Sequence, residues 1–280
     1  MEQQTFEKEF KISGIGLHSG VQSTLHFIPQ KEETGIVFSK GTEKVQALFS
    51  NVADTRNCTA LGLKGGVIAT IEHLMAALYI KGVDNLLIVT DSPELPILDG
   101  SALMWYEHFS QINLQPCHNQ KKYLKVVKPV TFADDNGNFV SLLPPTTDEM
   151  FVHFEIDFPS KIVGHQVFHG PVTEQVFKEQ IAPCRTFCEK YQIEYLQSIG
   201  LIKGGSLENA VVLDGDKILN PGGFKVQNEC VNHKVLDLIG DMFTSGYYIL
   251  ADIKAQRTGH FHNNMVLKKL FEDPSNFEIL

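Results

Sequence analysis

The chain has 280 residues, 43% of them hydrophobic and 20% charged, a composition typical of a soluble globular protein and not of a disordered one. It carries 24 Lys and Arg against 33 Asp and Glu, and this net charge of -9 without a basic cluster argues against nucleic acid as the main partner. The N-terminal stretch lacks the apolar run of a signal peptide, and the longest apolar stretches are too short for a transmembrane segment. We therefore expect a cytoplasmic protein.

The first half of the chain reads as strands with two helices. Residues 70–82 form a helix that we expect to begin with Thr70 as N-cap and to stop at Gly82. The other expected elements are strands at 22–29 and 34–39 joined by a turn at 30–34, a buried strand at 84–91, and a helix from residue 101. The polar stretch 115–122 looks rich in turns and predicts a domain boundary.

The second half repeats this order. The expected elements are a hairpin around the Asn-Gly turn at 136–137, a strand at 151–158, a short helix at 173–181, a hairpin at 209–220 with an Asp-Gly turn, a helix at 229–245 and a strand at 246–255. This pattern predicts an α+β protein with two domains of similar plan, 1–118 and 119–280.

The helix at 70–82 is apolar nearly all round, which is typical of a buried helix. Glu72 and His73 are its conspicuous polar residues, and leaving a polar group buried and unpaired costs roughly 2–7 kcal/mol. They can belong to a reaction site. Alternatively, Glu72 supports the helix N-terminus and His73 bonds a carbonyl.

The helix around 233–243 has a polar arc opposite its apolar face. His233 and Asp237 lie four residues apart and can reach one metal ion from adjacent turns. Asp241 can orient a further group, and Lys234 can meet a phosphate. The alternative interpretation is an ordinary solvated face.

A third segment, 257–264, contributes His260 and His262. In an extended conformation both imidazoles would point the same way. The alternative is a surface loop.

Together, the three segments supply the residue types of a metal-activated hydrolytic site. Two His and one Asp leave a fourth zinc position for water, as in catalytic zinc sites. A neighbouring Glu can accept the proton of this water, and a further His can protonate the leaving group. The HExxH and CxxC patterns are absent, and the five cysteines suit reduced thiols better than disulfides.

Seven blocks of the sequence, in this order, resemble the UDP-3-O-acyl-N-acetylglucosamine deacetylases, zinc amidases of lipid A synthesis. The blocks are "SGIGLHSG" (13–20), "TIEHLMAAL" (70–78), "ELPILDGSA" (94–102), "APCRTF" (182–187), "IEYLQSIGL" (193–201), "HKVLDLIGD" (233–241) and "TGHFHNN" (258–264).

The resemblance implies one catalytic zinc ion held by His73, His233 and Asp237. It implies that Glu72 is the general base and that His260, oriented by Asp241, is the protonated imidazole facing the leaving amine. Further implied roles are an oxyanion contact from Thr186, a diphosphate contact from Lys234, and substrate contacts near Phe158, Phe187, His18 and Cys58.

The resemblance also implies a fold of two α+β sandwich domains with their helices packed between the sheets. A βαβ insert at about 187–214 would form an apolar channel for the acyl chain. We expect a monomer acting on a small-molecule substrate, UDP-3-O-acyl-N-acetylglucosamine. The alternatives are a catalytically silent UDP-sugar-binding protein on the same fold and a zinc hydrolase for another acylated amide.

Overall fold

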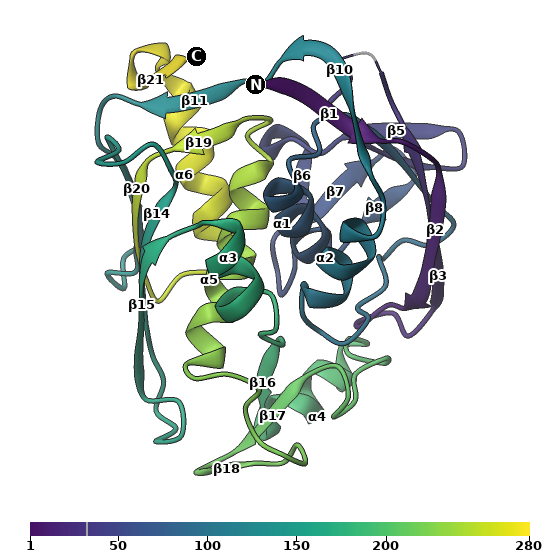
Figure 1. The fold of residues 1–280 in the computed structure, drawn as a ribbon. Coiled ribbons are helices and arrows are strands. Elements are labelled where there is room, and N and C mark those ends of the chain that lie inside the picture. Colours follow the sequence, from purple (N-terminus) through teal and green to yellow (C-terminus); the bar gives the residue numbers. More distant parts are fainter. Residues whose placement is uncertain (32) are drawn as a thin grey trace.

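Two five-stranded sheets lie on opposite sides of a layer of helices (Figure 1). The computed structural model describes residues 1–31 and 33–280. The first sheet has the order β2 (Phe10–Ile15), β3 (Gln22–Pro29), β9 (Leu86–Thr90), β4 (Ile36–Lys40), β5 (Glu43–Gln46). The second has the order β12 (Val130–Ala133), β13 (Phe139–Leu143), β20 (Asp252–Gln256), β14 (Phe151–Asp157), β15 (His165–Pro171).

The two sheets match strand for strand. In each, the first three neighbours pair antiparallel, the next pair is parallel, and the last pair is again antiparallel. In each, the strand at the centre comes last along the chain, after a long excursion that contains a helix. The mixed α+β class predicted from the sequence is therefore confirmed.

Smaller sheets flank this frame. One pairs β1 (Glu2–Phe6) with β10 (Leu114–Gln120), one joins β6 (Val52–Asp54), β7 (Ala60–Leu63) and β8 (Gly66–Ile68), and one joins β19 (Tyr248–Leu250), β11 (Tyr123–Val126) and β21 (Phe277–Ile279). The fourth joins β16 (Phe187–Glu189), β17 (Val211–Asp214) and β18 (Lys217–Ile218). With α4 (Lys190–Ser198) between the parallel strands β16 and β17, it forms the βαβ insert expected near 187–214.

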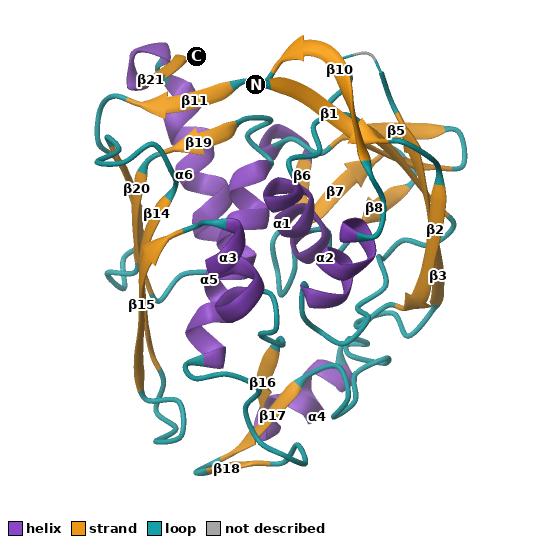
Figure 2. Ribbon diagram, in the orientation of Figure 1, coloured by secondary structure: helices purple, strands orange, loops and turns teal. Residues whose placement is uncertain are grey.

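The helical layer contains α1 (Glu72–Lys81), α2 (Leu103–Ser110), α5 (Glu229–Phe243) and α6 (His260–Glu272) (Figure 2). Shorter elements are α3 (Glu174–Val176), η1 (Phe49–Asn51), η2 (Phe177–Ile181) and η3 (Pro274–Asn276). Across residues 1–31 and 33–280, none of these helices is both long and apolar enough to cross a bilayer.

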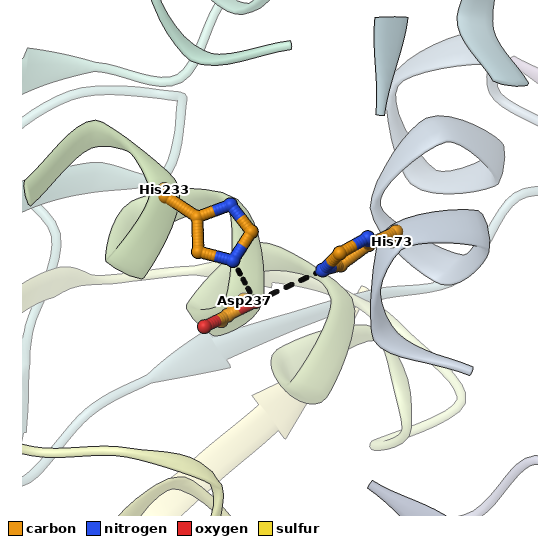
Figure 3. A group of neighbouring side chains, drawn as sticks. All are labelled: His73, His233 and Asp237. Carbon is orange, nitrogen blue, oxygen red and sulfur yellow. Dashed lines mark ion pairs between the residues drawn. The ribbon is translucent and has the colours of Figure 1, made fainter. Parts of the chain in front are cut away.

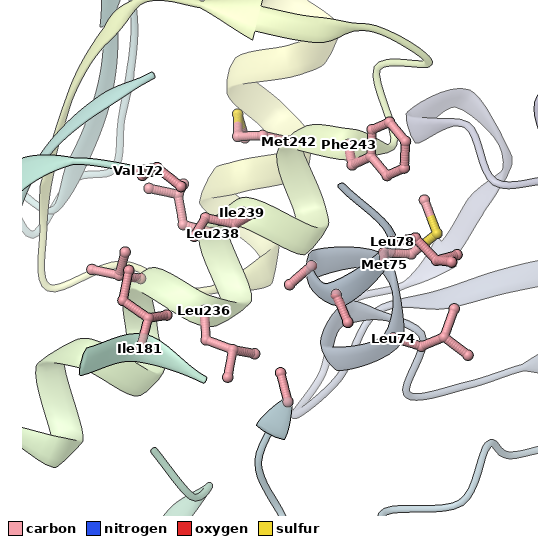
Figure 4. Close-up of a cluster of buried hydrophobic side chains, with 14 of the residues drawn as sticks. Leu74, Met75, Leu78, Val172, Ile181, Leu236, Leu238, Ile239, Met242 and Phe243 are labelled. Atoms are coloured by element: carbon pink, nitrogen blue, oxygen red, sulfur yellow. The ribbon is translucent and has the colours of Figure 1, made fainter. Parts of the chain in front are cut away.

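Helices α1 and α5 pack against each other at the centre of the molecule. Their apolar faces bring Leu74 and Met75 of α1 into one buried cluster with Leu236 and Phe243 of α5 (Figure 4). Gly240 permits the close approach, because a Cβ at this position would lie 2.0 Å from the carbonyl oxygen of Glu72. This contact fixes the start of α1 beside the C-terminal part of α5.

Some local expectations were wrong. Thr70 is not an N-cap, because α1 begins at Glu72 after Ile71, and Thr70 has a positive φ of 62°. The stretch 115–122 is mostly strand β10 and not a turn, since it pairs with β1. The strand expected at 246–255 is broken into β19 and β20, which belong to different sheets. Part of the turn expected at 30–34, residue 32, lies outside the described residues.

Candidate active site at the α1–α5 crossing

The polar arc of α5 is buried and is not a solvated face. His233 and Asp237 are each 2% exposed and Asp241 is 3% exposed, whereas Lys234 is the one residue of the helix that is not fully buried. Carboxylates and imidazoles at such depth are costly unless they are paired or bind a ligand. The solvated interpretation of this helix is therefore wrong.

Three side chains of this region form a compact group of potential metal ligands. His73 from α1 joins His233 and Asp237 from α5, and one ligand atom from each lies within 4.8 Å of the others (Figure 3). Asp237 Oδ1 lies 3.4 Å from His233 Nε2 and 3.6 Å from His73 Nε2. The spacing of residues in the sequence predicted the α5 pair, and the fold adds His73 to it.

The donor set fits a divalent cation such as zinc. Asp237 Oδ1 is buried and has no hydrogen-bond partner among the described residues, although it points between the two imidazoles. Burial lowers the pKa of His233 to about 3, so its ring is neutral and can act as a ligand. Its Nδ1 lies 3.0 Å from the carbonyl oxygen of Cys184, which leaves Nε2 free to face the group.

Asp237 is ionised in this setting. Burial alone would raise its pKa, but the positive charge of Lys234 and contacts with His233 and His73 hold this pKa well below its usual value. Lys234 Nζ donates to Asp237 Oδ2 over 2.9 Å. The ammonium group thus occupies one carboxylate oxygen and leaves the other for a cation.

Glu72 begins α1 beside this group and is 2% exposed. Its Oε2 accepts a hydrogen bond from the backbone N–H of Thr59 over 3.0 Å, and its Oε1 lies 3.9 Å from His260 Nε2. Burial raises the pKa of Glu72, and the nearby His260 and His73 limit the rise. A carboxylate with a raised pKa is suited to accepting a proton near neutral pH.

His260 is the first residue of α6, and Asp241 fixes the orientation of its ring. Its Nδ1 lies 2.8 Å from Asp241 Oδ2. Burial opposes the charged ring, but Asp241 and Glu72 outweigh this effect and raise the pKa of His260 to about 9. Asp241 also accepts hydrogen bonds from Thr59 Oγ1 (2.6 Å) and Asn263 Nδ2 (2.8 Å), so its position is well determined.

These groups open into one small cavity of about 40 Å³. Eight of the residues predicted from the sequence line it: His18, Glu72, His73, Thr186, His233, Lys234, Asp237 and His260. A larger cavity of about 350 Å³ lies elsewhere, around Met75, Phe243 and Tyr247, and none of the predicted site residues lines it. The predicted site residues therefore gather at the smaller cavity.

The remaining candidates lie around the site. Phe187 packs edge-on against Phe158 with ring centroids 5.4 Å apart and contacts the ring of His233 at 6.3 Å. Cys58 is buried, and burial raises its pKa beyond the range of a thiolate at neutral pH. Neither Cys58 nor the two phenylalanines line the cavity itself.

His262 points away from the site. Its Nε2 lies 3.1 Å from Asp134 Oδ2, in the turn between β12 and β13. The segment was expected to be extended or a loop, but α6 begins at His260, and two residues on a helix differ by about 200° in direction. The imidazoles of His260 and His262 therefore lie in different environments.

Several residues that complete the site were missed from the sequence. Thr59 links Glu72 to Asp241, and Asn263 holds Asp241. The buried pair of Arg185 with Glu229 (2.8 Å) anchors the segment that carries Thr186. Arg185 and Asn263 left a signal, since they lie within the blocks "APCRTF" and "TGHFHNN", whereas Thr59 and Glu229 lie outside the seven blocks.

Comparison with known proteins identifies the family. A family model described as LpxC, UDP-3-O-acyl N-acetylglycosamine deacetylase, matches residues 3–272. Relatives named UDP-3-O-acyl-N-acetylglucosamine deacetylase include those of Aliarcobacter butzleri, 39% identical over 100% of this chain and 93% of the relative, and Nitratiruptor sp., 39% identical over 100% and 94%. That of Histophilus somni is 38% identical over 100% and 93%. The chain therefore belongs to the UDP-3-O-acyl-N-acetylglucosamine deacetylase family.

Proposed function

We propose that His73, His233 and Asp237 hold one zinc ion, and that Glu72 and His260 move the protons of an amide hydrolysis. Members of this family are metal-dependent deacetylases that act on UDP-3-O-acyl-N-acetylglucosamine in lipid A synthesis, and the chain shares this activity. The observation that carries the site assignment is the buried group of three ligand atoms within 4.8 Å, in a cavity that Glu72 and His260 also line.

A bound zinc ion would supply Lewis acidity toward both the amide carbonyl and water. The protein supplies the proton transfers. Glu72, whose Oε2 is held by Thr59 N–H, is the proposed base that accepts the proton of the attacking water. His260 keeps one N–H on Asp241 and turns Nε2 toward the cavity, where its proton is available to the leaving amine.

Thr186 is the proposed donor to the oxyanion. It lines the cavity, and its backbone N–H donates to the carbonyl oxygen of Gly100 over 2.8 Å, which fixes the residue from the other half of the chain. Donors of this kind typically contribute about 2.7–4 kcal/mol to lowering the barrier. We assign Lys234, which is bound to Asp237 but still partly exposed, to the diphosphate, and His18, Cys58, Phe158 and Phe187 to substrate contacts.

The organisation of the chain supports further proposals. The matching sheets favour two domains of similar plan, 1–118 and 119–280, with helices packed between sheets. The βαβ insert is the proposed channel for the acyl chain. Five free cysteines are consistent with a reducing, cytoplasmic location, and we propose a monomer.

The test is to measure zinc content and deacetylation on the same samples of purified protein. We expect about one zinc per chain and release of acetate from UDP-3-O-acyl-N-acetylglucosamine. Glu72→Gln should abolish turnover and retain zinc, because the ligands are untouched. Glu107→Gln, an exposed glutamate on α2, is the matched control and should behave like the wild type.

Two results would contradict the site assignment. One is a fully zinc-loaded protein in which His260→Ala and Glu72→Gln both retain wild-type rates. The other is unchanged zinc content in His73→Ala. Turnover of acylated amides that lack UDP would instead point to a broader hydrolase.

A further inference from the structure

Glu94 is a buried carboxylate at the edge of the site to which the mechanism assigns no role. It follows β9 and is 3% exposed. Among residues 1–31 and 33–280 it has no Lys, Arg or His partner within ion-pair distance. A buried charge without a cation needs several hydrogen bonds to be tolerated. Its contacts therefore indicate what the residue is for.

Those hydrogen bonds all come from segments that build the cavity. Oε1 accepts from the backbone N–H of His18 over 2.8 Å and from Thr70 Oγ1 over 3.2 Å. Oε2 accepts from the backbone N–H of Ser19 over 2.7 Å. One carboxylate thus holds the loop of His18 and the residue that leads into α1.

The loop is shaped around this carboxylate. A Cβ at Gly16 would lie 2.5 Å from Glu94 Oε2, so glycine is what lets the two approach. On its outer side the loop is held by the insert, where Lys203 N–H donates to the His18 carbonyl oxygen over 3.1 Å. The backbone of His18 is therefore fixed on two sides.

The side chain of His18, in contrast, has no hydrogen-bond partner in the described part of the chain. Both ring nitrogens are buried without a hydrogen bond among the described residues, and the ring lines the cavity beside Glu72, Thr186 and Lys234. Unpaired polar atoms at a cavity are available to a ligand. Thr70 supports the same interpretation. A β-branched residue rarely adopts a φ of 62°, and the hydroxyl of Thr70 donates to Glu94 Oε1, the oxygen that also accepts from the backbone N–H of His18.

We propose that Glu94 is a positioning residue that holds the His18 loop and the approach to α1 in the geometry that binds substrate. It does not touch the substrate and acts through the ring of His18. The proposal rests on the proposed function, because it places the substrate in this cavity.

The test is a double-mutant cycle on the zinc-loaded full-length protein. Glu94→Gln keeps the size of the side chain but sets an NH2 group against a backbone N–H, so one strong bond is lost. We expect KM for UDP-3-O-acyl-N-acetylglucosamine to rise about tenfold, the factor for losing one hydrogen bond to a charged group. Zinc content should stay unchanged.

The cycle separates positioning from general stability. If Glu94 acts through His18, the variant Glu94→Gln/His18→Ala has the KM of the worse single variant, since the contact is already lost. Asp252→Asn is the matched control: this carboxylate also anchors a loop, through Thr146 N and Oγ1, but lies away from the cavity, and KM should not change.

Gly16→Ala gives an independent route, because the added methyl would lie 2.5 Å from both Glu94 Oε2 and Ser19 Oγ and would disturb the contact between the carboxylate and the loop without altering the carboxylate. Gly16→Ala should raise KM by a similar factor, and its effect should also be non-additive with that of His18→Ala. If Glu94→Gln does not fold, the cycle of Gly16→Ala with His18→Ala tests the proposal instead. Multiplicative effects in the cycle, or an unchanged KM in Glu94→Gln, would overturn the proposal. Failure of the proposed function is distinct, since the wild type itself would then not turn over the substrate.

Discussion

His260 lies between two carboxylates, and this arrangement determines how the site responds to pH. Glu72 has a raised pKa, and the pKa of His260 is about 9. We expect kcat/KM to rise as Glu72 ionises and to fall as His260 loses its proton near pH 9. Asp241→Asn removes the charge that raises the pKa of His260 most, so the fall should move to lower pH by about 1–3 units.

The measurement is kcat/KM of zinc-loaded protein across pH 5–10. Asp134→Asn is the control, because Asp134 pairs with His262 in the same way but away from the cavity. An unchanged basic limb in Asp241→Asn would show that another group controls it.

The same shift has a consequence for folding. Because the pKa of His260 is raised in the folded protein above its value of 6.5, its contribution to stability is fully present below about pH 6.5 and is lost as pH rises through about 9. Urea unfolding at pH 6 and pH 9.5 should show a smaller pH effect in His260→Ala than in the wild type. An equal change in the free energy of unfolding between pH 6 and pH 9.5 in both proteins would show that His260 does not have the raised pKa.

At the level of residues, the sequence predicted the groups that stand out against their helix. Glu72 and His73 on an apolar helix, and the His233 and Asp237 pair, were found for this reason. Thr59, Asn263 and Glu94 were not, because a common polar residue acquires its role only when folding brings a distant partner to it. Helical periodicity also could not distinguish a solvent-exposed polar face of a helix from a buried polar face.

Among the elements, the crossing of α1 and α5 is the one on which the site depends. Gly240→Ala would place a methyl group 2.0 Å from the Glu72 carbonyl oxygen and push the helices apart. We expect the free energy of unfolding to fall by about 1–3 kcal/mol, the usual cost of overpacking, and zinc affinity to fall as well. Urea unfolding and zinc titration measure these effects.

Gly170→Ala is a suitable control for this prediction. The nearest atom to its added Cβ, in Phe168, is 3.9 Å away, an ordinary contact, and its φ is not in the left-handed region. Wild-type zinc affinity in Gly240→Ala would mean that the crossing can relax without disturbing the ligands.

The elements themselves were largely predictable where hydrophobic periodicity was strong, as in α5 and β3. The predicted elements were wrong where a contact with a residue distant in the sequence overrides the local preference of the chain. Thr70 has the chemistry of an N-cap, but its hydroxyl is bound to Glu94 and its backbone is left-handed. Most of the polar stretch 115–122 pairs with β1, and this pairing makes it a strand.

For the whole molecule, the proposed metal site joins the two halves of the chain. His73 comes from the first half and His233 and Asp237 from the second, so a bound ion would cross-link α1 to α5. Zinc at 100 times its Kd should add about 2.7 kcal/mol to the free energy of unfolding. Urea unfolding with and without chelator measures this, and His73→Ala should lose most of the difference. The same increment in His73→Ala would place the metal elsewhere.

The strand-for-strand match between the two large sheets has a consequence for how such a site can arise. Helices α1 and α5 each precede the central strand of their own sheet, α1 directly and α5 with β19 in between. Yet α1 carries the proposed base and one proposed ligand, whereas α5 carries two proposed ligands and Asp241, which contacts His260. The repeated sheet topology thus brings two helices together at one crossing, and the proposed hydrolysis needs these helices to carry different side chains. Two identical halves would present the same side chains twice at the crossing. They would not supply one group that accepts a proton and a different group that donates one.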